Sequence, residues 1–132
     1  MYSKKLQTTA TFNLCDGTQL SRTGLCDLEG ALVRLGGDRR LLTELVQIYI
    51  EDAPMLLMRI SNGVRDANRS DVLHAAHLLA GLAANLGAPS VTNPAERLEE
   101  IAVAGRLDEA FATVEELQTQ AARLEIDLQP YR

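Results

Sequence analysis

The chain has 132 residues, of which 46 % are hydrophobic and 4 % aromatic, and its formal net charge at pH 7 is −5. A domain of this length buries roughly two thirds of the surface of its unfolded chain, so it can fold without a disulfide or a metal. The acidic balance argues against nucleic-acid binding, which needs clustered Lys and Arg, and no run reaches the roughly 18 apolar residues of a transmembrane helix.

The first 24 residues are rich in Thr, Ser and Gln and have no sustained apolar period. We interpret residues 1–24 as an N-terminal tail or linker, followed by one helical domain over residues 25–132. The tail carries basic residues but lacks the apolar stretch of a secretory signal. Cys15 and Cys26 have no metal-binding spacing, and reduced thiols are typical of the cytoplasm, where we expect the protein to reside.

Helical patterns begin after the tail. Asp27 can cap a short helix that the glycine pair at 36–37 would end, and Asp38 can cap a second helix over RRLLTELVQIYIEDA. Because proline is poorly tolerated in a helix interior, Pro54 predicts a bend and a third helix over residues 54–67.

The fourth predicted helix has an unusual outer face. It begins at Ser70 and Asp71, runs to Leu86 and ends at Gly87. If Leu79 marks the centre of its buried face, the apolar residues fall within about 60° of that centre. A solvated face normally carries charged side chains, but the opposite side of this helix carries Ser70, His74, His77, Gly81, Ala84 and Ala88.

Gly81 is the most informative residue of that face, because glycine inside a helix costs roughly 1 kcal/mol relative to alanine. One explanation is that another protein approaches the backbone one turn after His77. The other is that Gly81 packs against a neighbouring helix of the same domain and that both histidines are ordinary surface residues. The helical period alone leaves both explanations open.

A fifth helix is predicted to start with Asn93 as cap and Pro94 in its first turn, and to stop at Gly105. The last helix should cover residues 107–127 and bury Leu107, Ala110, Phe111, Val114, Leu117, Ala121 and Leu124. Short loops between successive amphipathic helices favour antiparallel packing. We therefore predict an all-α, up-and-down antiparallel four-helix bundle with one or two additional N-terminal helices.

Residues 76–88, AHLLAGLAANLGA, resemble the signature of histidine phosphotransfer (HPt) domains, A-H-x-L-K-G-[SA]-[SA]-x-x-[ILV]-G-A. The match covers the histidine, the apolar residue two positions later, the glycine four positions later and the closing Gly-Ala. The helices before and after this run are also similar to those of the family, so the resemblance spans roughly residues 27–127. Two positions differ: Ala80 stands where the family usually has lysine, and Leu82 where it often has a small polar residue.

The resemblance implies a monomeric phosphocarrier of two-component phosphorelays, a signalling module and not an enzyme with its own catalytic apparatus. His77 would accept the phosphoryl group, Gly81 would give clearance, and Glu99 would orient the imidazole. The docking surface for receiver domains would include Leu73, His74, Ala80, Gly81, Ala84 and Ala88. Such a module needs no cofactor of its own, because the receiver domain supplies Mg²⁺.

Two alternatives stand beside this interpretation. Because Ala80 replaces the usual lysine, the chain could be a degenerate HPt-like adaptor that binds a receiver or kinase domain without phosphotransfer. His74 and His77 could instead ligate a metal with Glu99, although zinc usually takes three or four protein ligands and no fourth is evident. We expect no metal site.

Overall fold

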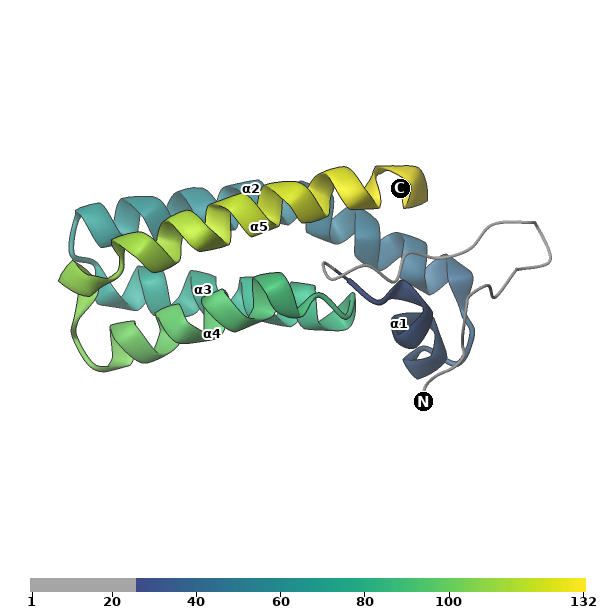
Figure 1. The fold of residues 1–132 in the computed structure, drawn as a ribbon, viewed down its shortest axis with the longest axis horizontal. Helices are drawn as coiled ribbons and strands as arrows, with labels where there is room; N and C mark the ends of the chain where they lie inside the picture. The colour runs from purple at the N-terminus through teal and green to yellow at the C-terminus, as the bar shows by residue number, and fades with distance from the viewer. Residues whose placement is uncertain (1–25) are drawn as a thin grey trace.

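The computed structural model describes residues 26–132, which form a helical bundle (Figure 1). Its α-helices are α1 (Leu28–Arg34), α2 (Arg39–Arg65), α3 (Arg69–Asn85), α4 (Pro89–Val103) and α5 (Phe111–Leu128), and 3-10 turns cover Leu107–Glu109 and Gln129–Tyr131. The four longer helices run up and down along the long axis, and α1 lies at the end where α2 begins. The predicted fold class is confirmed, with one additional N-terminal helix. The predicted tail lies outside the described residues.

The ends of α1 are set by the residues that the sequence indicated. Asp27 Oδ1 accepts a hydrogen bond from the Gly30 N–H at 3.0 Å, which caps the helix. The glycine pair that follows α1 has positive φ angles, +70° at Gly36 and +82° at Gly37, which L side chains rarely adopt. Asp38 then caps α2 by accepting from the Leu41 N–H at 3.0 Å.

The predicted helix boundary at Pro54 is wrong, because α2 continues through this residue. A proline in a helix removes the hydrogen bond to the carbonyl four residues earlier. Pro54 is exposed, so water can reach that carbonyl, while Ala53 and Leu56 on either side are buried in the core. Packing on both sides of Pro54 therefore outweighs the lost hydrogen bond and keeps one 27-residue helix.

The predicted start of the next helix at Asn93 is also wrong. α4 begins at Pro89, where a missing N–H costs nothing because the first helical N–H groups have no partner in the helix. Pro94 lies inside α4 and is buried. The burial of an apolar ring compensates for the interrupted hydrogen-bond pattern.

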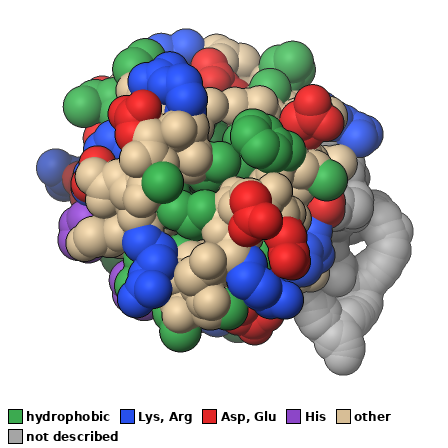
Figure 2. Space-filling model, turned by 90° about the vertical axis from the view of Figure 1, so that its left-hand side faces the viewer, with side chains coloured by type: hydrophobic (Ala, Val, Ile, Leu, Met, Phe, Trp, Pro, Cys, Tyr) green, Lys and Arg blue, Asp and Glu red, His purple; other side chains and the backbone are tan. Residues whose placement is uncertain are grey.

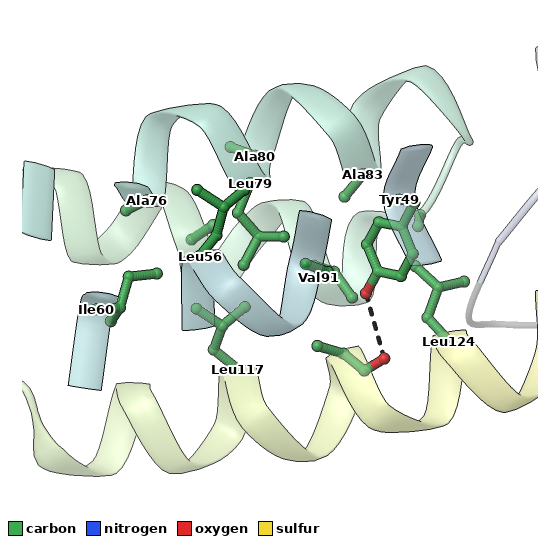
Figure 3. Close-up of a cluster of buried hydrophobic side chains, with 14 of the residues drawn as sticks. Tyr49, Leu56, Ile60, Ala76, Leu79, Ala80, Ala83, Val91, Leu117 and Leu124 are labelled. Atoms are coloured by element: carbon green, nitrogen blue, oxygen red, sulfur yellow. Dashed lines mark hydrogen bonds between the residues drawn. The ribbon is translucent and has the colours of Figure 1, made fainter. Parts of the chain in front are cut away.

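The core is aliphatic, as the composition indicates (Figure 3). One phenol is built into it: Tyr49 of α2 donates a hydrogen bond from its hydroxyl to the Ala121 carbonyl of α5 at 3.2 Å. Burial, together with the nearby Glu125 carboxylate, raises the pKa of the Tyr49 hydroxyl far above its ordinary value. Phe111, which we predicted to be buried, is exposed because α5 begins only at this residue. In the described part of the chain, no helix is long and apolar enough to span a membrane.

Candidate functional site

Helix α3 presents the candidate site on its outer face. Asn68 caps it by accepting from the Asp71 N–H at 3.1 Å, two residues before the predicted start. Gly87, with a φ of +64°, follows its C-terminus as predicted. The face that we predicted to be buried is buried: Val72, Ala75, Ala76, Leu79, Ala83 and Leu86. α2 and α4 pack against α3 and leave the side that carries His77 open.

The imidazole of His77 is open to solvent, with 74 % of its side chain exposed. Seen from the end of the bundle, the histidine side chains lie at one edge of the molecule (Figure 2). The Nδ1 atom of His77 lies 3.2 Å from Oε1 of Glu99, whose side chain is 24 % exposed on α4. In a neutral ring with the proton on Nδ1, the N–H points to this carboxylate and Nε2 keeps its lone pair. Within residues 26–132, no hydrogen bond occupies Nε2. The arrangement thus fixes the ring and leaves its other nitrogen available as a nucleophile.

Among residues 26–132, nothing packs against the position that a side chain at Gly81 would occupy. A Cβ atom added to it would meet nothing within 4 Å, and the residue is exposed. This finding removes the explanation that Gly81 accommodates a neighbouring helix. The cost of a glycine in the middle of α3 therefore has no cause among the described residues.

The predicted docking residues are only partly exposed. Leu73, His74, Gly81 and Ala84 reach the surface. Ala80 and Ala88, however, are buried, at 6 % and 1 % exposure, so their prediction as surface residues is wrong. Ala80 is buried because helices cover α3 on two sides, so that its buried face is wider than a helical wheel with one centre predicts. Ala88 is buried because it lies beyond α3, as the N-terminal cap of α4.

An open hollow of about 440 Å³ lies beside His77, between α3 and α4. Small residues form its α3 side and carboxylates its α4 side; it is lined by His77, Ala80, Gly81, Ala84, Glu96, Glu99 and Glu100. No Lys or Arg is among the lining residues. Of these three carboxylates, only Glu99 was predicted from the sequence as a site residue. The positions of Glu96 and Glu100, three residues before and one residue after Glu99, place all three on one face of α4.

The other flank of α3 carries an apolar groove of about 310 Å³ against α2. Its lining residues are Asp52, Met55, Leu56, Arg59, Leu78 and Leu82. Met55 and Leu78 are exposed, at 67 % and 41 %. Neither residue was predicted from the sequence. Leu78 directly follows His77, but its position, about 100° from the assumed centre of the buried face, belongs clearly to neither face. Met55 lies on α2 and meets α3 only through the packing of the two helices. The exposed histidine thus lies between an apolar groove and an acidic hollow.

The described part of the chain offers no metal centre, since residues 26–132 contain no group of three or more His, Cys, Asp and Glu side chains that could hold an ion. His77 is paired with Glu99 alone. The arrangement matches a single exposed nucleophile with one orienting carboxylate.

Comparisons with known proteins agree with this geometry. The family model described as "Hpt domain" matches residues 44–127. The crystal structure of histidine-containing phosphotransfer protein B from Pseudomonas aeruginosa PAO1 superposes with a TM-score of 0.72 at 21 % sequence identity. That match covers 80 % of this chain and 93 % of the other, and at this identity it establishes the fold alone. No curated protein sequence matches the chain significantly.

Proposed function

Because the chain belongs to the Hpt domain family, whose model covers residues 44–127, we propose that it carries a phosphoryl group on Nε2 of His77 between receiver domains of a phosphorelay. The single observation that carries this proposal is the geometry of His77. Its ring is largely exposed, its Nδ1 contacts Glu99 at 3.2 Å, and Gly81 one turn later leaves open space beside it. A buried or obstructed ring could not meet a phosphorylated aspartate of another protein.

The transfer step follows from these atoms. The Nε2 lone pair attacks the phosphorus of an aspartyl phosphate on the receiver, an N–P bond forms, and the O–P bond breaks to release the aspartate carboxylate. The Nδ1 proton stays on the ring, which becomes cationic. Glu99 then faces that positive charge at hydrogen-bond distance, so it favours the product ring and holds its orientation.

The remaining requirements of phosphoryl transfer fall to the partner. Transfer needs neutralisation of the phosphoryl charge, and the lining of the hollow beside His77 contains no Lys or Arg. We infer that the receiver domain supplies Mg²⁺ and a cationic side chain, and that this chain contributes the nucleophile and the docking surface. It acts as a phosphocarrier module and not as an enzyme.

The docking surface that we propose extends over the exposed part of α3 and the apolar groove beside it. Leu73, His74, Gly81 and Ala84 belong to it from our sequence analysis, and Met55 and Leu78 join it from the structure. Exposed apolar side chains that adjoin a reactive group are typical of a protein contact surface. Ala80 retains a role only as part of the floor of the hollow.

Transfer from receiver domains of the same organism, phosphorylated with a small acyl phosphate, tests the proposal. We expect wild-type protein to gain an acid-labile, base-stable label, His77→Gln to gain none, and the matched control His74→Gln, which changes the docking surface but keeps the nucleophile, still to be labelled. Circular dichroism should show the same helicity and melting for all three. Label on His77→Gln would refute the assignment. Stable receiver binding without transfer to wild-type protein would favour the adaptor function, which the alanine at position 80 suggests.

A further inference from the structure

The two outer carboxylates of the hollow lack a compensating charge. Glu96 and Glu100 line it together with His77, and neither makes an ion pair within residues 26–132. Arg97, which lies between them in sequence, instead pairs with Glu116 of α5 at 2.5 Å. The negative charge of the hollow is therefore not neutralised by α4 itself.

Arg34 is the cationic side chain that contacts a lining residue of the hollow, but this contact lies far from His77. Arg34 of α1 donates to the carbonyl of Ala84 at 3.4 Å. Ala84 is seven residues from His77, which is about 10 Å along a helix. Over this distance the charge of an exposed guanidinium is largely screened at physiological salt. Glu96 and Glu100, in contrast, lie within one helical turn of Glu99, whose carboxylate contacts the ring of His77.

Phosphorylation changes the charge at this place. A phosphoryl group on His77 adds about two negative charges to a residue that lines the hollow with Glu96 and Glu100, while the positive charge of the product ring is matched by Glu99. Glu99 contacts the ring itself, whereas Glu96 and Glu100 line the hollow beside it. Like charges that face each other across open solvent repel each other at low ionic strength.

We propose that Glu96 and Glu100 raise the free energy of the phosphorylated state of His77, so that the transfer equilibrium lies towards the partner's aspartate. Cationic groups of a partner that covers the hollow would offset this repulsion and favour phosphorylated His77. This inference rests on the proposed function, because it assigns a thermodynamic direction to the same site. It makes the chain a donor of phosphoryl groups and not a store.

A measurement without any receiver domain isolates this effect. The full chain is phosphorylated with phosphoramidate, whose P–N bond breaks to release ammonia as the bond to Nε2 forms. The phosphorylated protein is then equilibrated with free imidazole, which exchanges the phosphoryl group between two imidazole nitrogens. Intact mass spectrometry, with His77→Gln as the blank for labelling elsewhere on the chain, gives the partition between His77 and imidazole.

We expect the variant with Glu96→Gln and Glu100→Gln to shift the partition towards phosphorylated His77 by about three- to tenfold at low salt. The variant with Glu96→Ala and Glu100→Ala should shift it equally, which excludes hydrogen bonding by the new amides. The control with Glu51→Gln and Glu115→Gln makes the same change in net charge at exposed positions of α2 and α5. It should shift the partition less than about twofold.

Salt provides a further check, because the screening length falls from about 10 Å at 0.1 M to about 3 Å at 1 M. The difference between wild type and the hollow variants should then largely disappear. The inference would be overturned if both variants of Glu96 and Glu100 kept the wild-type partition at low salt, or if the control variant shifted the partition as much as they do. Failure of the proposed function is distinguishable, because it appears as absent transfer from receivers while the imidazole partition stays measurable.

Discussion

Two glycines lie six residues apart at α3 and differ in their surroundings. Gly81 sits on the exposed face beside His77, where an added Cβ would meet nothing within 4 Å. Gly87 sits in the seam between the end of α3 and the segment before α1, with a φ of +64°. Its carbonyl accepts a hydrogen bond from the Asp27 N–H at 2.8 Å, and an added Cβ would lie 2.8 Å from the Asp27 carbonyl oxygen.

The difference separates two causes of small residues within one sequence motif. Gly87 is required by the fold, because both its backbone angle and its contact with Asp27 exclude a side chain. Within the part of the chain that the structure describes, Gly81 has no such requirement, and its helix would be more stable with alanine. A residue that costs stability without an internal reason indicates an external one. The exposed face of α3 is therefore the part of the motif that we connect with a partner.

The largest expected effect is a loss of stability on substitution of Gly87. Gly87→Ala should lower the free energy of unfolding by roughly 2–4 kcal/mol, because the alanine is strained at this φ and overlaps a backbone oxygen. Urea denaturation measures the loss. The matched control is Gly36→Ala, which has a similar φ of +70° but nothing within 4 Å of the new Cβ. It should lose only about 1 kcal/mol from strain. Equal losses in the two variants would show that the contact with Asp27 contributes nothing.

A substitution on the exposed face of α3 should reduce phosphoryl transfer without reducing stability. Gly81→Gln should reduce the transfer rate from a phosphorylated receiver at least about tenfold, since a long side chain would block the approach to His77, while its unfolding free energy stays equal or rises. Gly81→Ala is the control, with a gain of up to about 1 kcal/mol and a smaller effect on transfer. A marked loss of stability in Gly81→Gln would show that the fold requires this glycine, as it requires Gly87.

The interior offers a smaller effect that depends on pH. Burial, strengthened by Glu125, raises the pKa of Tyr49 above its ordinary value near 10, so the folded chain keeps a proton that the unfolded chain releases. The stabilisation that this raised pKa gives to the folded chain is complete below pH 10. Above pH 10 the free energy of unfolding falls by about 1.4 kcal/mol per pH unit. Tyr49→Phe should cost about 1 kcal/mol at neutral pH through the lost hydrogen bond to Ala121. Urea denaturation between pH 7 and 11 should show the two proteins converging above pH 10, whereas parallel curves would contradict the assignment.

Much of the fold follows from local sequence features. The caps at Asp27 and Asp38 and the buried face around Leu79 could be predicted, because short-range hydrogen bonds and helical period determine them. Pro54 and Pro94 could not be placed correctly, because a local rule counts the lost hydrogen bond but not the packing that offsets it. The order of the helices was nevertheless sufficient for the fold class.

The candidate site divides in the same way. His77 and Glu99 were indicated by the resemblance to the family, and the structure brings them to 3.2 Å. The apolar groove with Met55 and the outer carboxylates of the hollow depend on how α2 and α4 lie against α3. A single helix considered alone cannot reveal surfaces that two helices form together. The burial of Ala80 was mispredicted for the same reason.

The most direct test of the central claim is to locate the phosphoryl group after transfer from a phosphorylated receiver domain. Nitrogen-15 and phosphorus-31 NMR of the labelled chain identify both the histidine and the ring nitrogen that carries it. We predict an N–P bond at Nε2 of His77, with the Nδ1 proton still directed to Glu99. A phosphoryl group on His74 or on Nδ1 of His77 would contradict the account.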